Sequence, residues 1–417
     1  MVLEIRLSNF FSIKDEIVLD LRAASINTAK ARMLKDNIFQ INKNKVLKTI
    51  AIYGANASGK SNIIKAIRFC NMMIINSHLH NENSIFNFVP FKFSGYQRKP
   101  STYFIRFISK GIEYEYSFTL TRTEIITESL FYYPQGRIKK IFTRDERSGK
   151  TKKEKYSFGS VIRRPMDVAE STSNKTLYIS RASQMDRDIA KEIFNYFNTH
   201  FILGYRGFNA GSVEYLFNEN KEILLKALKI ADSDIVDIKI RKEKHQSKSV
   251  NVDFASNQVS FGNAEQDLLR ITTYHNLSPK IPFDFGLEES AGTQKLFFIM
   301  LTIIDIIKHN KILLIDEIGE SLHTKIIEYI LSLFHSSQSA QLIFTTHNTK
   351  LLDLDKLRKD QIYFVNKTEK GATDLYSLYD YSDFRDTMDA EKAYLQGRFD
   401  AVPFIDVLEN LNTILNE

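Results

Sequence analysis

Cysteine, tryptophan and long apolar runs are scarce in this sequence of 417 residues. It contains one cysteine, Cys70, and no tryptophan. A single cysteine excludes an intramolecular disulfide and a cysteine-rich zinc site. The longest uncharged apolar run, 296–304, ends at Asp305. Because a membrane-spanning helix needs about 20 apolar residues, we expect a chain that does not cross a bilayer.

A secretory signal is also missing from the N-terminus. Charged residues occur already at Glu4 and Arg6, and no apolar stretch of signal-peptide length follows them. With the cysteine count, this predicts a cytoplasmic protein. Hydrophobic residues make up 43% and charged residues 26% of the chain, which excludes wholesale disorder. The length predicts two or three domains, or one large α/β body with an insertion.

Positive charge is concentrated in one short segment. The whole chain has 57 Lys and Arg against 50 Asp and Glu, a net charge of +7. Residues 137–164 alone hold eleven Lys and Arg against three Asp and Glu, so the rest of the chain is nearly neutral. This pattern suits a solvated hairpin whose lysines discourage strand pairing, or a contact with nucleic-acid phosphates or an acidic protein. Tyr132, Tyr133, Phe142 and Tyr156 interleave with the charges and suit either base stacking or a sheet face.

The periodicity of apolar residues predicts an α/β chain with an antiparallel meander. Alternating aromatic and β-branched runs over 102–142 are typical of that meander. Short strands are expected at 2–7, 17–21, 48–53, 268–274, 281–286, 311–316 and 340–346, and a hairpin around 235–261. Helices are expected at 60–75, 184–199, 212–230, 292–308 and 322–335.

The first chemical motif is a complete GxxxxGK[ST] pattern that follows an apolar strand and opens a helix. A tight glycine-bearing turn at a helix N-terminus presents the convergent N–H donors that phosphate oxygens need. Lys60 is expected to reach the β- and γ-phosphates, and the Ser61 hydroxyl to bind Mg²⁺. A chance match is the alternative, and the strand–turn–helix context argues against it. The predicted ATP-binding residues are Gly54, Ala55, Asn56, Ala57, Ser58, Gly59, Lys60, Ser61 and Asn62.

The second motif is four aliphatic residues, 312–315, followed by Asp316 and Glu317. A buried strand would hold Asp316 at its carboxyl end, within reach of the Mg²⁺ shell. Glu317 is then placed to act as the general base on the attacking water. Alone the pattern is common, but together with the phosphate-binding loop it favours a catalytic site.

Two further elements bear on the kind of NTPase. Ser290 begins a Ser/Gly-rich helix start, Ser-Ala-Gly-Thr-Gln-Lys, which suits either an anion site or a simple N-cap. His347 ends the strand that follows the carboxylate pair. A lone histidine there is usually structural, but in this order it can instead sense the terminal phosphate.

In this order, the motifs resemble the ABC-class ATPases, most closely the soluble branch that includes SMC and RecF proteins. The opening LSNFFSIK and the Asn in GANASGKSN are similar to that branch. More narrowly, ESAGTQKL, LLIDEIGESLH, FTTHNTKLL and AYLQGRFDAVPFI resemble the compact predicted ATPases of prokaryotic anti-phage (abortive-infection) operons. The resemblance covers roughly 1–120 and 265–405.

This resemblance implies roles for particular residues. Gly54, Asn56, Gly59, Lys60 and Ser61 match the phosphate loop, Asp316 the Mg²⁺ ligand, Glu317 the catalytic glutamate and His347 the switch histidine. Ser290, Gly292 and Gln294 match the signature motif, which in this class acts on the partner subunit's nucleotide, and 321–323 match the D-loop at the dimer interface. Ala291 replaces a usual glycine, and the Q-loop glutamine is not placed.

The resemblance also implies the domain order. We expect an ABC-type P-loop ATPase head of the α/β class, with an antiparallel β meander and a mixed α/β insertion. Its parts would be an N-terminal lobe at 1–120, a basic insertion or lid at 121–265, and a C-terminal lobe at 266–417. Too few heptads are present between the lobes for a long SMC-type coiled coil.

The expected function is a homodimeric ATPase that sandwiches ATP and Mg²⁺ and controls a separately encoded effector, such as a nuclease or Toprim-like protein, in anti-phage defence. A higher oligomer and a nucleic-acid contact through 137–164 stay open. One alternative is an SMC/RecF-like ATPase of DNA repair. A transporter nucleotide-binding subunit is disfavoured by the motif spacing, and a fused nuclease by the short stretch after His347.

Overall fold

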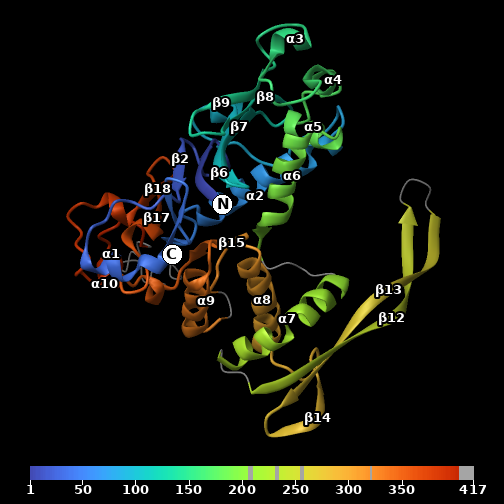
Figure 1. Cartoon of the computed structure of the whole chain (residues 1–417), viewed down its shortest axis with the longest axis vertical. Helices are drawn as coiled ribbons and strands as arrows, with labels where there is room; N and C mark the ends of the chain where they lie inside the picture. The colour runs from blue at the N-terminus through green and yellow to red at the C-terminus, as the bar shows by residue number, and fades with distance from the viewer. Residues whose placement is uncertain (205–209, 231–233, 254–257, 320–321, 403–417) are drawn as a thin grey trace, which may run out of the picture. The chain divides into compact units, whose positions relative to one another are not determined.

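The computed structural model describes residues 1–204, 210–230, 234–253, 258–319 and 322–402. The chain divides into two compact units (Figure 1). The first comprises Met1–Gly204, Asn310–Glu320 and Leu331–Glu417, and the second comprises Tyr205–His309 and Ser321–Ile330. Within the described residues, no helix is long and apolar enough to cross a membrane.

A seven-stranded antiparallel sheet forms one layer of the first unit. Its strand order is β10-β9-β8-β7-β6-β1-β2. The strands are β1 (Val2–Ser8), β2 (Ile17–Asp20), β6 (Ser101–Ser109), β7 (Ile112–Leu120), β8 (Ile125–Tyr133), β9 (Lys139–Asp145) and β10 (Tyr156–Phe158). Figure 1 shows β7, β8 and β9 side by side, as the alternating apolar pattern predicts. The predicted meander is confirmed, and β7 and β8, on either side of residue 120, pair antiparallel within it.

A second, six-stranded sheet carries the motifs. Its order is β11-β15-β16-β5-β17-β18, in which β18 alone is antiparallel to its neighbour. The strands are β5 (Thr49–Gly54), β11 (Phe201–Leu203), β15 (Ile312–Ile315), β16 (Gln341–Thr346), β17 (Ile362–Lys367) and β18 (Thr373–Ser377). Every residue of β5, β15 and β16 is buried, as expected for parallel strands that are covered on both faces. Their carboxyl ends lie at one edge of the sheet, where such folds bind ligands.

The 17-residue helix α2 (Lys60–Asn76) follows β5 directly and buries Ile63, Ile64, Ile67 and Ile74 in the core. One predicted helix, 184–199, is wrong in its extent: α5 ends at Gln184 and α6 begins at Asp188, with Asp186 at φ 56° between them. The shorter helices that complete this unit are α1 (Ala29–Met33), α3 (Lys152–Lys155), α4 (Pro165–Glu170), α5 (Tyr178–Gln184), α6 (Asp188–His200) and α10 (Ala390–Leu395). Between α1 and β5, β3 (Ile38–Ile41) and β4 (Asn44–Leu47) form a hairpin. Helix α9 (Thr324–Ser336) is divided between the two units, with its residues up to Ile330 in the second and those from Leu331 in the first.

The second unit combines two helices with a three-stranded sheet. Helix α7 (Ala210–Ile230) packs on the apolar helix α8 (Ala291–Lys308), with the rings of Phe217 and Phe297 6.4 Å apart. Strands β12 (Ile235–Asp253), β13 (Gln258–His275) and β14 (Ser278–Asp284) follow one another in the sheet. Figure 1 shows β12 and β13 as a long two-stranded arm.

The predicted separate strand at 268–274 is wrong, because it is the end of β13. Pairing between β12 and β13 runs in one register from Asp253↔Gln258 to Tyr274. The predicted hairpin around 235–261 is therefore longer than expected, and its tip, 254–257, lies outside the described residues.

The basic segment 137–164 is only partly a solvated surface. Arg144 is completely buried: its guanidinium donates to the carbonyls of Thr176 (2.7 Å) and Ser173 (2.9 Å) and lies beside two carboxylates. Phe142 and Tyr156 are buried too, and pack against Tyr178. Of the two alternatives for Phe142 and Tyr156, the structure supports the sheet face over base stacking, because the sheet turns both rings into the core.

Candidate nucleotide site

The loop that follows β5 requires glycine at both of its ends. A Cβ on Gly54 would lie 2.4 Å from the carbonyl oxygen of Val365. A Cβ on Gly59, whose φ is +116°, would lie 2.0 Å from Thr373 Oγ1. Ala57 also has a positive φ, 63°. The spacing of the GxxxxGK motif thus matches a compact loop pressed against β17 and β18.

Three polar side chains brace this loop from outside the motif. Thr373 Oγ1 donates to the carbonyl of Ser58 (3.1 Å) and lies 2.6 Å from Ser12 Oγ. Asn62 Nδ2 donates to Ser12 Oγ at 2.6 Å. Sequence reasoning missed Ser12 and Thr373 as site residues. Ser12 stands in the LSNFFSIK opening, whereas no local pattern singles out Thr373.

Lys60 folds back over the loop that precedes it. Its Nζ donates to the carbonyls of Gly54 (2.9 Å) and Ala55 (3.0 Å). The side chain is 4% exposed. Burial lowers the pKa of Lys60, and the nearby carboxylates Glu317 and Asp316 oppose that shift. The ammonium is thus held at the carboxyl edge of the sheet, close to two negative charges.

The carboxylate pair follows β15 and is tied to the neighbouring strand. Thr345 Oγ1 in β16 donates to Asp316 Oδ1 (2.7 Å) and accepts from the backbone N–H of Glu317 (2.8 Å). Glu317 has a φ of 55°, which is uncommon for a residue other than glycine. A fully buried hydroxyl therefore fixes the carboxylate of Asp316 and the backbone of Glu317. Thr345 was not predicted, although its place two residues before His347 was an available signal.

His347 joins Lys60 and Glu317 in one cluster. Its Nε2 lies 3.1 Å from Glu317 Oε1 and 3.1 Å from Lys60 Nζ, and Lys60 Nζ lies 3.9 Å from Glu317 Oε1. Burial lowers the pKa of His347, the charge of Lys60 lowers it further, and Glu317 opposes both. The imidazole is therefore mainly neutral at pH 7. Nε2 can then donate to Glu317 or accept from Lys60, but not both at once.

The residues around the loop suit a phosphate group and a hard cation. Ser58 Oγ is buried without a hydrogen-bond partner among the residues that the structure describes. The first turn of α2 adds the N–H groups that a helix start leaves to outside acceptors. Ser61 and Asp316 offer the oxygen ligands that Mg²⁺ prefers. Across the described ranges, no group of three or more His, Cys, Asp or Glu forms a metal cluster of its own.

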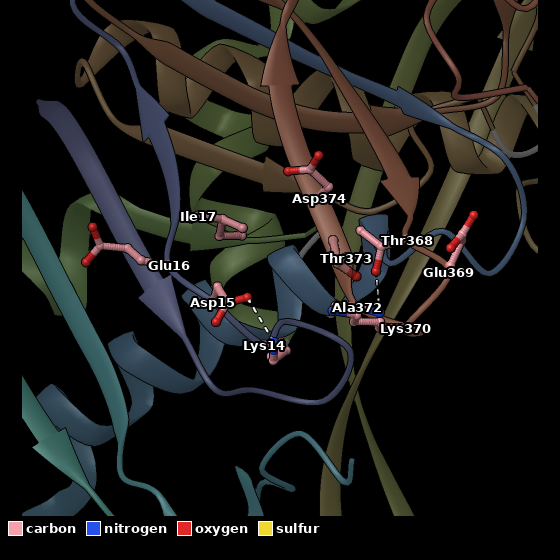
Figure 2. A pocket seen from close by; sticks show the side chains of 10 residues that line it. All are labelled: Lys14, Asp15, Glu16, Ile17, Thr368, Glu369, Lys370, Ala372, Thr373 and Asp374. Atoms are coloured by element: carbon pink, nitrogen blue, oxygen red, sulfur yellow. Dashed lines mark hydrogen bonds and ion pairs between the residues drawn. The ribbon is translucent and has the colours of Figure 1, made fainter. Parts of the chain in front are cut away.

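A pocket of about 460 Å³ adjoins the braced loop (Figure 2). It is lined by 14–17, at and before the start of β2, and by 368–370 and 372–374, at and before the start of β18. Figure 2 shows Lys14 and Asp15, 3.4 Å apart, on one wall and Thr373 on another. Thr373 thus lines this pocket and also donates to the carbonyl of Ser58 in the loop.

The predicted signature residues lie in the second unit. Ser290 is the N-cap of the 18-residue helix α8, and its Oγ accepts from the backbone N–H of Thr293 at 3.1 Å. Of the two alternatives for this helix start, the N-cap is observed, and the anion site stays a prediction. Gln294 Nε2 donates to the carbonyl of Glu289 at 3.0 Å, while Ser290 and Gly292 are exposed. In the predicted D-loop, Ser321 lies outside the described residues, and His323 is exposed.

Three SMC heads are among the solved structures that the chain matches. The head bound to the C-winged helix domain of ScpA has 18% identity and a TM-score of 0.41, over 90% of this chain and 97% of that one. The SMC head from Thermotoga maritima has 14% identity and a TM-score of 0.40, over 90% and 98%. The head from Pyrococcus furiosus with an extended coiled coil has 15% identity and a TM-score of 0.39, over 95% and 98%.

No curated protein matches the chain. A family model does match it, over residues 50–353, which include the glycine-rich loop, the carboxylate pair and His347. This family is AAA_21, described as "AAA domain, putative AbiEii toxin, Type IV TA system". Since the match covers well over half of the sequence, the chain belongs to the AAA_21 family of P-loop ATPase domains.

Proposed function

We propose that this protein binds ATP with Mg²⁺ and hydrolyses it. The observation that carries the proposal is the cluster of Lys60, Glu317 and His347 at the carboxyl edge of the parallel sheet. These three residues come from segments far apart in the sequence. They lie beside a loop whose two glycines are required by its close packing.

Each side chain has a distinct part in this proposal. Lys60 and the loop N–H groups hold the phosphates, and Glu317 takes the proton of the attacking water. Ser61 and Asp316 would hold Mg²⁺, which supplies charge neutralisation on the phosphate oxygens. His347, kept neutral by burial and by Lys60, orients the carboxylate of Glu317 through Nε2.

The pocket of Figure 2 is proposed to take the nucleoside part of ATP. Its volume of about 460 Å³ falls in the range of small-molecule sites. The support is Thr373, which lines the pocket and also donates to the carbonyl of Ser58 in the proposed phosphate-binding loop. Lys14 and Asp15 on its wall supply polar groups that can contact a base or a ribose.

The proposed active form is a homodimer that encloses two nucleotides. In this arrangement Ser290, Gly292 and Gln294 of one chain contact the γ-phosphate held by Lys60 of the other. The support is the exposed N-terminus of α8, since a helix start with a capping serine attracts anions. ATP bound across the interface stabilises the dimer, and hydrolysis loosens it.

The biological role we propose is that of a sensor or regulator in anti-phage defence, with a separately encoded nuclease or Toprim-like effector. The family description, which names an abortive-infection toxin and a toxin–antitoxin system, supports defence over the alternative of DNA repair. A gene for a nuclease next to this one would favour the defence role. A neighbouring set of repair genes would favour the alternative.

Phosphate release by the purified protein tests the catalytic proposal. Lys60→Ala should abolish ATP binding, whereas Glu317→Gln should keep it and lower turnover by about 10²-fold or more, as for the loss of a general base. The matched control is Glu170→Gln, at an exposed carboxylate on α4. Turnover of Glu317→Gln near the unmutated rate would remove Glu317 from its proposed role.

A nucleic-acid contact is the second candidate function, favoured by the charge on the β9–β10 edge of the antiparallel sheet. The cations that stay exposed and form no ion pair within the described residues are Arg137, Lys139, Lys140, Arg147, Lys150, Lys153, Arg163 and Arg164. Lys152 and Lys155 differ, because they bond the carbonyl of Thr172 and the carboxylate of Glu146. The exposed set, but not the whole basic segment, is therefore proposed to meet phosphates.

Charge reversal distinguishes a phosphate contact of these cations from a role in solubility alone. Lys139, Lys150 and Lys153 changed together to Glu should lower the log–log salt slope of duplex DNA binding by about 3, if each cation meets one phosphate. The control changes the exposed lysines 35, 43 and 45 to Glu, which alters the net charge equally. Equal binding by both variants, in fluorescence anisotropy at several salt concentrations, would contradict the assignment.

A further inference from the structure

His275 lies at the end of β13 between two carboxylates of the second unit. Its Nδ1 is 2.6 Å from Asp234 Oδ1, and its Nε2 is 2.8 Å from Glu289 Oε1. Thr273, two residues earlier on β13, also donates to Glu289. Asp234 immediately precedes β12, so the contacts tie the base of the two-stranded arm to the segment before α8.

Both ring contacts together require a particular protonation state. An ionised carboxylate only accepts hydrogen bonds, and a neutral imidazole has one N–H. The two bonds therefore form together when the ring carries two N–H groups and a positive charge. Burial lowers the pKa of His275, but the hydrogen bonds to Asp234 and Glu289 outweigh it and leave the pKa above 6.5.

Glu289 connects this contact to the predicted signature motif. Its side chain is 7% exposed, and its backbone carbonyl accepts from Gln294 Nε2 at 3.0 Å. The residue is thus held by β13 through its carboxylate and by α8 through its carbonyl. Ser290, the N-cap of α8, is the next residue. A change in the position of Glu289 would therefore move Ser290.

We propose that His275 is a positioning residue of the ATPase, which in its protonated form fixes Glu289 and thereby Ser290. The inference rests on the proposed role of Ser290 at the nucleotide of a partner chain. His275 touches neither nucleotide nor metal in this scheme. Its effect passes through Glu289, and it links the arm formed by β12 and β13 to the start of α8.

Few other groups bear on the titration of this histidine. Within the described part of the second unit, the charged groups that face the ring are Asp234 and Glu289. From β14, the ring of Phe283 meets it edge-on, with centroids 4.6 Å apart. Because the pKa of His275 is raised, both hydrogen bonds of its ring form below pH 6.5, and the pair is lost as the pH rises through the pKa of the folded state. Turnover should therefore fall on the alkaline side.

The test is the pH profile of kcat at saturating ATP for the full-length protein. His275→Gln cannot titrate and cannot replace both hydrogen bonds to Asp234 and Glu289. Its kcat at pH 6.5 should therefore be about tenfold lower, as for the loss of a charge-assisted hydrogen bond. Its alkaline fall should also disappear. The matched control is His309→Gln, at the other end of α8, where an exposed histidine pairs with Asp305.

A second variant keeps the test valid if His275→Gln folds poorly. Asp234 is 65% exposed, so Asp234→Asn should leave the fold intact while removing one partner that raises the histidine pKa. Its alkaline fall should shift to lower pH. The NMR titration of the His275 ring, followed alongside, should report a pKa above 6.5 in the unmutated protein and a lower one in this variant.

The outcomes separate the two levels of the proposal. If the unmutated protein hydrolyses no ATP at any pH, the proposed function fails, and the positioning role fails with it. If it is active but His275→Gln and Asp234→Asn keep the unmutated pH profile, as His309→Gln should, only the role of His275 is overturned. Affinity for ADP, held by the first unit, should be unchanged in all three variants.

Discussion

The hydroxyl of Thr373 offers the sharpest test of how the nucleotide loop is held. Thr373→Val keeps the shape of the side chain but removes the hydroxyl that joins Ser12 Oγ (2.6 Å) to the carbonyl of Ser58 (3.1 Å). Both contacts are lost at once. The backbone bond from Thr373 N to the carbonyl of Ser12 (2.7 Å) stays, so the strand itself keeps its place.

The expected size of the effect follows from these two bonds. A hydrogen bond between neutral groups contributes about 1 kcal/mol net, so the pair contributes about 2 kcal/mol. If all of this holds the loop in its binding conformation, ATP affinity falls by about 30-fold, since 1.4 kcal/mol corresponds to tenfold. Ser58 is 3% exposed, so water cannot easily replace the missing donor. Any part that acts on global stability instead makes the loss of affinity smaller.

Isothermal titration with ATP and urea unfolding, measured on the same samples, separate the two effects. The matched control is Thr127→Val in β8, whose hydroxyl bonds that of Thr119 (2.7 Å) within the antiparallel sheet. The control should lose stability but not affinity. If Thr373→Val binds ATP as tightly as the unmutated protein, the reasoning that this hydroxyl braces the loop is refuted.

Two further predictions address the shared site and the buried charge. Ser290→Arg and Lys60→Ala should each be inactive, yet mixing them should restore part of the ATPase activity through heterodimers with one intact composite site. If the activity of the mixtures never exceeds the sum of the separate variants, and no ATP-dependent dimer crosslink forms, the shared site is contradicted. Arg144→Met should lower the free energy of unfolding by about 3–5 kcal/mol, because it leaves the fully buried Glu128 carboxylate without its cation. Urea unfolding followed by circular dichroism measures that loss, with the exposed Arg147→Met as the control, which should unfold near the unmutated midpoint.

Local patterns in the sequence were enough to place most of the proposed site. The GxxxxGK motif between an apolar strand and a helix, the Asp316–Glu317 pair after a second strand and His347 after a third each depend on neighbours within a few residues. Parallel strands align their carboxyl ends, so three strand ends with polar residues imply one cluster. The contacts among Lys60, Glu317 and His347 agree with that expectation.

Periodicity was less informative where two elements of the same type adjoin. The helical pattern over 184–199 runs through the break between α5 and α6, because the turn at Asp186 interrupts the backbone without interrupting the apolar spacing. In the same way, the sequence divided β13 in two, because polar residues in the middle of a strand resemble those of a loop. Pairing with β12, not hydrophobicity, keeps that strand continuous.

The sequence by itself was enough to predict the residues of the proposed nucleotide site, because phosphate loops and carboxylate pairs are local arrangements of a strand, a turn and a helix. Only the tertiary structure decided what supports them. Ser12 and Thr373 are 361 residues apart, yet their hydroxyls meet at the loop. Composition counts Arg144 with the other cations of the basic segment, but the fold buries it beside Glu128. Hydrogen bonds and ion pairs depend on distance in space, which a distance along the chain does not reveal.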